Sequence, residues 1–111
     1  MIYEPKKDLY TILSAITGVT VYQSRPEIIE NLPSITFYIG SNIPEYVLEK
    51  NIGKQDIEVV IDIFAKTSIK SGELLATLEE TMLENGYRLV FNMDMPEDDL
   101  HHITTRFNLS T

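Results

Sequence analysis

The sequence contains no cysteine, and this excludes a disulfide framework, a thiolate nucleophile and a cysteine-based metal site. No stretch approaches the roughly 18 apolar residues of a membrane span, and the first residues, MIYEPKKD, lack the apolar run of a signal peptide. Basic residues are also few: 9 stand against 17 acidic residues, for a net charge of −8. Because phosphate-backbone binding needs clustered lysine and arginine, this composition disfavours such binding and is typical of a protein kept soluble by its charge.

Sequence motifs of catalysis are absent as well. The chain has no P-loop, no GxGxxG and no HExxH, and no Ser-His-acid set can be singled out. We therefore predict no enzymatic activity, no cofactor, and no catalytic, cofactor-binding or metal-binding residues. With 111 residues, the chain is long enough for one domain with a substantial core, spanning 1–111.

A strong strand pattern is present between Lys54 and Lys66. Alternate side chains of this segment are apolar on one face, which comprises Ile57, Val59, Ile61, Ile63 and Ala65. The other face is mixed and comprises Glu58, Val60, Asp62, Phe64 and Lys66. This asymmetry predicts a two-layer protein, with helices on one side of a sheet and an outer face that can meet another partner.

Two amphipathic helices are predicted to cover the apolar face. The first begins at Pro5 and ends near Gly18, and the second runs from about Ile69 to Asn85 before Gly86. Three hydroxyl residues are equally good N-caps for the second helix: Thr67, Ser68 and Ser71.

Further strands follow from alternation at period two, at Thr20–Tyr22, Pro33–Gly40, Tyr87–Met93 and His102–Leu109. The segment Gly40–Gly53 is either a long connection or two strands extended into a protruding hairpin, and Glu27–Asn31 is either a helical turn or a loop. The predicted fold is thus an α+β two-layer sandwich, a mostly antiparallel sheet with two helices on one face. Its element order is α-β-β-β-α-β-β.

The strand patterns also assign side chains to the two faces of the sheet. The predicted inner face consists of Ile35, Phe37, Ile39, Ile57, Val59, Ile61, Ile63, Leu89, Phe91, Ile103 and Phe107. The predicted outer face consists of Tyr38, Val60, Phe64 and Val90 among Thr36, Glu58, Asp62, Arg88, His102 and Arg106. Several apolar residues on one outer face favour contact between subunits over a fully solvated surface.

Asp62 is the most notable carboxylate, because it lies in the middle of a strand. It is either an ion-pair partner of Arg88 or Arg106 across strands, or a solvated side chain. His101 and His102 are the only histidines. Neighbours on a strand point to opposite faces, so we expect surface or lightly buried histidines and not a shared metal site.

An acidic group near the end of the chain comprises Asp94, Glu97, Asp98 and Asp99. Carboxylates of this kind can bind a hard cation, but the segment lacks the spaced Asp/Asn and Gly pattern of a calcium loop. We interpret it as an acidic turn between two strands.

The whole chain resembles the small tail terminator (tail completion) proteins of long-tailed bacteriophages and prophages. The resemblance is carried by the amphipathic first helix and by VYQSRPEIIENLPSITFYIG, with Pro26 and Pro33. It continues in the junction IEVVIDIFAKTS, in LENGYRL, and in the closing MPEDDLHHITTRFNLS. It is a pattern of elements spread over nearly all residues, and related neck and minor tail proteins share it.

The resemblance implies a structural role in virion assembly. Proteins of this family form a ring, commonly a hexamer, on the last layer of tail tube protein, where they stop tube growth and bind the head-side connector. DNA passes through the lumen of the ring without sequence-specific binding, and the acidic balance of this chain would disfavour binding of that DNA. The implied location is the head–tail joint of a virion made in the bacterial cytoplasm, and the free chain is either a monomer or already associated.

Other readings fit the same residues. The nearest alternative is another head–tail connector, neck or minor tail protein. A small ligand-binding or regulatory α+β domain, or an enzyme using Asp62 or His101–His102, belongs to a different class. A deep pocket with convergent polar groups would favour either of the last two.

Overall fold

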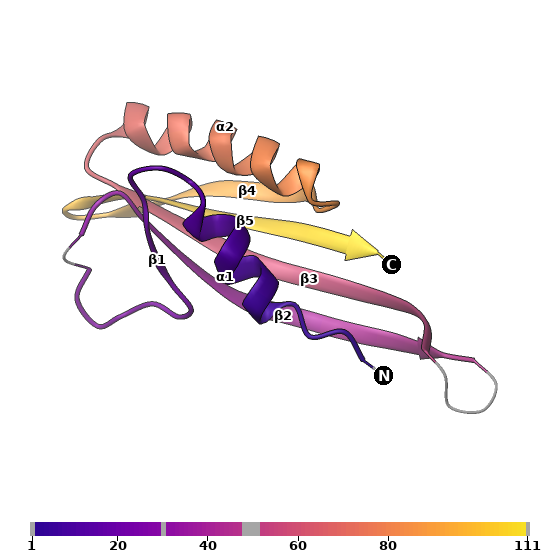
Figure 1. The fold of residues 1–111 in the computed structure, drawn as a ribbon. Helices are drawn as coiled ribbons and strands as arrows, with labels where there is room; N and C mark the ends of the chain where they lie inside the picture. The colour runs from indigo at the N-terminus through magenta and orange to yellow at the C-terminus, as the bar shows by residue number, and fades with distance from the viewer. Residues whose placement is uncertain (1, 30, 48–51, 111) are drawn as a thin grey trace.

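A five-stranded sheet, with strands in the order β1-β2-β3-β5-β4, forms one layer of the protein, and two helices form the other (Figure 1). The computed structural model describes residues 2–29, 31–47 and 52–110. The strands are β1 Thr20–Tyr22, β2 Ser34–Tyr46, β3 Ile52–Ala65, β4 Arg88–Glu97 and β5 Leu100–Ser110; the helices are α1 Lys6–Ser14 and α2 Ser68–Glu84. Strands β1 and β2 pair in parallel, whereas β2 with β3, β3 with β5, and β4 with β5 pair antiparallel. The predicted fold class and element order are confirmed.

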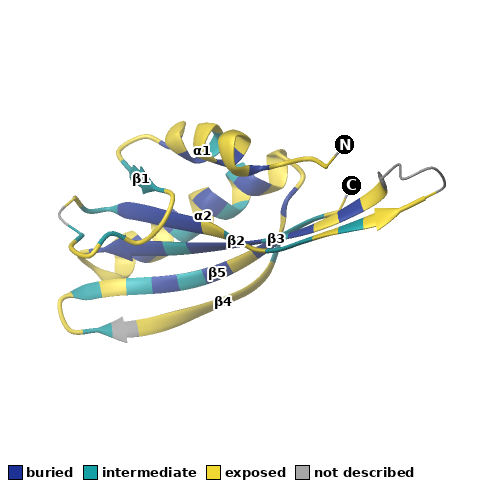
Figure 2. Cartoon of the chain, turned by 90° about the horizontal axis from the view of Figure 1, so that it is seen from below, coloured by how far each residue is buried: buried dark blue, intermediate teal, exposed yellow. Residues whose placement is uncertain are grey.

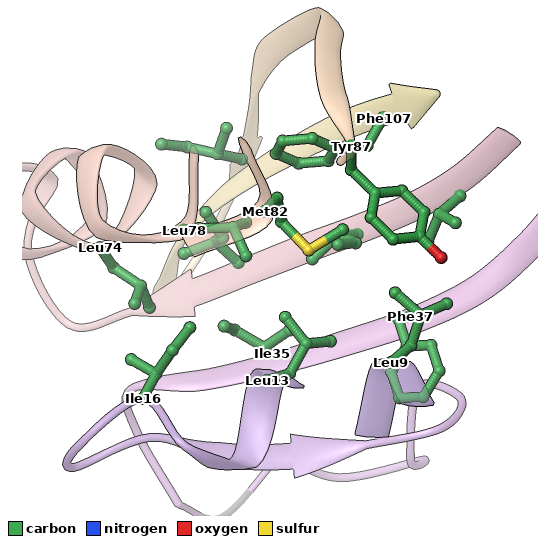
Figure 3. Close-up of a cluster of buried hydrophobic side chains, with 14 of the residues drawn as sticks. Leu9, Leu13, Ile16, Ile35, Phe37, Leu74, Leu78, Met82, Tyr87 and Phe107 are labelled. Atoms are coloured by element: carbon green, nitrogen blue, oxygen red, sulfur yellow. The ribbon is translucent and has the colours of Figure 1, made fainter. Parts of the chain in front are cut away.

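The core lies between the helices and the inner face of the sheet. From α1 it takes Leu9 and Leu13, and from α2 it takes Leu74, Leu78 and Met82, all at helical spacing (Figure 3). The apolar face predicted for β3 is confirmed, since Ile57, Val59, Ile61 and Ile63 are each 0% exposed. Burial of this side by both helices makes the opposite side of the sheet the outer face.

The ends of α2 follow the local chemistry of the chain. Of the three N-cap candidates, Thr67 is the cap, because its side-chain oxygen accepts a hydrogen bond of 3.1 Å from the Lys70 amide. Gly86 follows the helix with φ of +89°, a conformation that favours glycine. The first helix ends earlier than predicted, at Ser14, and Gly18 closes the turn that follows it with φ of +79°.

A β-bulge in β4 makes one predicted inner residue an outer one. Leu89 lies opposite Phe107, but the next pair along the ladder is Phe91 with Arg106, so Val90 is the extra residue. A one-residue slip moves the following side chains to the other face. The assignment of Phe91 to the core is therefore wrong: Phe91 is 43% exposed on the outer face.

The segment around residues 40–53 is a protruding hairpin, the second of the two alternatives predicted for it. The ends of β2 and β3 extend beyond the helices (Figure 1), and residues 48–51 of the predicted connection lie outside the described part of the chain. At its base, the Gln55 amide nitrogen donates to the carbonyl of Tyr3 at 2.7 Å and to the side-chain oxygen of Asn42 at 2.6 Å. Gln55 is 3% exposed, so the N-terminal segment is fastened to the hairpin by a buried side chain.

The connection from β1 to β2 passes over the outer face. Because these strands are parallel, the chain must return to the end from which β1 began. We call this connection, residues 23–29 and 31–33, the crossover segment. It is a loop, so the helical alternative for Glu27–Asn31 is wrong over the described residues of that range; residue 30 lies outside them.

Candidate functional site

Side chains on the outer face lie in rows that run across the sheet. Each row takes one residue from β2, β3, β5 and β4, in that order. The first row is Ser34, Phe64, His102 and Met95; the second is Thr36, Asp62, Thr104 and Met93; the third is Tyr38, Val60, Arg106 and Phe91. Their exposure differs strongly along the sheet, as the colouring in Figure 2 shows. The first two rows are buried over β2 and much of β3, whereas the β4 end of every row is exposed.

The crossover segment covers the buried end of this face. The Arg25 guanidinium lies over the ring of Phe64, 4.8 Å from its centroid, and the His102 ring stacks beside the same ring at 4.3 Å. Phe64 is consequently 0% exposed and Thr36 is 2% exposed. Phe64 and Thr36 lie on the outer face, as assigned from the sequence, but a loop of the same chain covers them.

Four charged or polar side chains form a connected network around Phe64. Arg25 donates to Glu97 at 2.7 Å, His102 Nδ1 lies 2.5 Å from Glu97, and His102 Nε2 lies 3.0 Å from Asp62. The hydrogen bond from Arg25 lowers the pKa of Glu97, and His102 acts in the same direction, while burial opposes them. We call Arg25, Glu97, His102 and Asp62 the outer-face network.

The network corrects the prediction for Asp62. Its partner is His102, and not Arg88 or Arg106. Arg106 lies instead over the ring of Phe91, 5.7 Å from its centroid. His101 and His102 do point to opposite faces, as predicted, and His101 is exposed.

The chemistry available to His102 is limited by its contacts. A carboxylate lies at each ring nitrogen, so both contacts are hydrogen bonds when the imidazole carries two protons. The His102 side chain is 9% exposed, and neither nitrogen is free to take a proton from a substrate. The network therefore fastens the crossover segment to β3, β4 and β5.

The remaining part of the outer face is an exposed apolar patch. Its β4 part comprises Phe91, Met93 and Met95, which are 43%, 46% and 38% exposed. Tyr38 of β2, 53% exposed, lies in the same row as Phe91, with Val60 and Arg106 between them. Sequence reasoning assigned Tyr38 to this patch, but it missed the β4 residues because a bulge leaves no trace in a period-two pattern. Exposed apolar residues grouped on one sheet face are typical of a protein-contact surface.

Away from the sheet, an open groove of about 840 Å³ lies between α1 and α2. Threonines provide much of its polar lining. Of its three charged residues, Lys70 and Glu73 lie 3.5 Å apart as a pair, and Glu84 is the third. Over residues 2–29, 31–47 and 52–110, no three His, Asp or Glu side chains are placed to hold a metal ion. No catalytic set is assembled in the groove by the side chains that line it.

Comparison of the sequence with protein-family models and with curated proteins gives no match. Within the described residues, neither helix is long and apolar enough to cross a membrane. The fold thus defines the class, a two-layer α+β protein with exposed apolar side chains on the outer face of its sheet and on a projecting hairpin.

Proposed function

We propose that this chain is a structural protein that acts by assembly with other protein subunits. More specifically, we propose a tail terminator of a long-tailed phage or prophage. In this role, copies of the chain form a ring, a hexamer by analogy with the family, on the last layer of tail tube protein. The ring stops tube growth and binds the head-side connector.

The observation that carries this proposal is the presence of two separate exposed apolar surfaces on one subunit. One is the patch on the outer face. The other is the projecting end of the β2–β3 hairpin, where Ile43, Tyr46 and Val47 are 61%, 64% and 53% exposed. A closed ring needs two different surfaces on each subunit, because each contact joins one surface to the other.

The shape of the molecule supports the same role. It measures 52 × 25 × 24 Å, and the hairpin accounts for the far end of its long axis (Figure 1). A projecting arm with apolar side chains can reach an adjacent subunit or the tube. The covalent continuity of β2 and β3 with the core sheet gives this arm a rigid base.

The acidic balance fits the passage of DNA through such a ring. A net charge of −8 repels the phosphate backbone and disfavours retention of DNA in the lumen. The purified protein should therefore show no tight association with duplex DNA at low salt. Tight association there would contradict this part of the proposal.

Electron microscopy of phage particles made with and without the protein tests the proposal. Without a terminator, tubes should grow beyond their normal length and remain without heads, and adding the gene back should restore both length and joining. Tails of normal length that lack heads would instead identify another head–tail joining protein. Complete, infectious particles would overturn both assignments.

A further inference from the structure

Strand β4 is a free edge of the sheet along residues 88–97. It pairs with β5 on one side and has no neighbour on the other among the described residues. The strand is exposed along most of its length (Figure 2). A long exposed edge strand is a template for pairing with another chain unless something protects it.

Two of its protective features lie at its ends, and a third, the inward-pointing charge of Asp94, lies between them. The bulge at Val90 interrupts one end, and Pro96, which has no amide hydrogen, lies near the other. The stretch between them, residues 91–95, is regular and contains no lysine or arginine. Phe91, Met93 and Met95 point to the outer face, and Asn92 and Asp94 point to the inner face.

We propose that two copies of the free chain pair through this stretch, as antiparallel β4 strands related by a twofold axis at Met93. In this arrangement Met93 faces its symmetry mate, and Phe91 faces Met95 of the second copy on both sides of the axis. On the inner face, Asn92 lies opposite Asp94 of the second copy, so an amide donor meets a carboxylate acceptor. The segment is complementary to itself in both of its faces.

Other registers of the same pairing are worse. In an antiparallel pair, residues opposite each other point to the same side of the sheet. A shift by one residue would set Met93, which points to the outer face, opposite Asn92 or Asp94 of the second copy, which point to the inner face. An axis at Asp94 would place two carboxylates directly opposite each other, which is destabilising. An axis at Asn92 would draw the bulged Val90 into the ladder.

The other edge of the sheet offers no regular free strand of comparable length. Strand β1 has three residues, and the part of β2 beyond it contains an irregularity at Gly40 and the amide-free Pro44. Pairing through β4 joins two five-stranded sheets into one. Both helical layers stay on one side of this sheet, and the apolar patches of the outer faces become continuous across the seam.

This pairing concerns the free chain and does not rest on the proposed tail function. The absence of native cysteine allows a direct test by disulfide formation. In the Met93→Cys variant, facing Cα atoms would lie within the roughly 4.4–6.8 Å that a disulfide spans. In Met95→Cys, the two cysteines would lie about 14 Å apart along the strands and could not join.

We expect Met93→Cys to form a covalent dimer under mild oxidation, whereas Phe91→Cys and Met95→Cys each stay largely monomeric on a denaturing gel. An equal mixture of Phe91→Cys and Met95→Cys should form the mixed dimer. Equal crosslinking of all three single variants, or of none, would overturn the proposal. Crosslinking of Met95→Cys with itself alone would overturn the register.

Light scattering after gel filtration gives an independent measurement on the unmodified chain. The protein should have twice the monomer mass at micromolar concentration, and Met93→Lys should reduce it to the monomer mass. The control Ile69→Lys, at a site on α2 that is 74% exposed, should leave the dimer intact. A monomeric parent protein, or a ring or open-ended oligomer unaffected by Met93→Lys, would overturn the pairing.

Discussion

At the scale of single residues, His102 of β5 links two neighbouring parts of the outer face. It bonds Asp62 of β3 and Glu97 of β4, and through Glu97 it reaches Arg25 of the crossover segment. Neither carboxylate is more than 28% exposed, so each depends on its hydrogen-bond partners for part of its solvation. His102 thus lies between two partly buried carboxylates and contacts both.

Replacing His102 by alanine should lower the free energy of unfolding by about 1–3 kcal/mol, since it leaves two carboxylates without their shared partner. The measurement is urea denaturation at neutral pH, followed by circular dichroism. The matched control is His101→Ala, on the opposite and exposed side of the same strand, which should change stability by less than about 0.5 kcal/mol. Equal effects of the two substitutions would show that the network contributes nothing to stability.

The network also predicts a pH dependence. The pKa of Glu97 lies below its ordinary value of 4.5 in the folded protein, so the unfolded chain takes up this proton first as the pH falls. The ionised carboxylate therefore stabilises the fold above pH 4.5, and this contribution is lost as the pH falls through the lowered value.

Comparing the parent protein with Glu97→Gln in urea at several pH values measures this contribution. The stability difference should be present at neutral pH and should shrink in the acid range. Glu80→Gln, at an exposed site on α2, serves as the control and should show little difference at any pH. A difference for Glu97→Gln that stays constant down to pH 3 would contradict the assignment.

At the scale of elements, the period-two and helical patterns predicted the strands and helices that have one side buried in the core. The alternation in β3 was sufficient, because one whole side of that strand is covered by helices. The bulge at Val90 was not predictable, since it depends on pairing with β5 and not on the composition of β4. The position of Arg25 was not predictable either, because a loop has no period and its partner Glu97 is distant in the sequence.

Two glycines, one within α2 and one just after it, allow helix propensity and backbone geometry to be tested separately. Gly72 lies within the helix with no atom within 4 Å of an added Cβ, so Gly72→Ala should stabilise by about 0.5–1 kcal/mol. Gly86 has φ of +89°, and an added Cβ would meet Leu109 at 3.3 Å. Gly86→Ala should therefore destabilise by about 1–2 kcal/mol.

Thermal unfolding of the two variants measures these effects. The melting temperature should rise for Gly72→Ala and fall for Gly86→Ala, relative to the parent protein. The same sign for both would mean that one of the two backbone assignments is wrong.

At the scale of the whole molecule, the apolar residues divide into those that stabilise the subunit and those that remain available to partners. The hairpin end is the clearest case, because Ile43 and Tyr46 are more than 60% exposed although they lie on the long strand β2. Their conversion to serine should leave the free energy of unfolding within about 0.5 kcal/mol of the parent value. If the hairpin makes no contact with a partner, this change should also leave assembly unaffected.

If the hairpin contacts a neighbouring subunit or the tube, the double variant Ile43→Ser with Tyr46→Ser should fold normally but fail to restore tail length and head joining. The matched control is Ile28→Ser with Ile69→Ser, at sites 71% and 74% exposed, which removes two other exposed apolar side chains and should restore both. Tail lengths and the fraction of tails with heads, counted by electron microscopy, provide the measurement. Full function of the hairpin variant would place the assembly contacts elsewhere on the surface, and the patch on the outer sheet face would then be the first candidate.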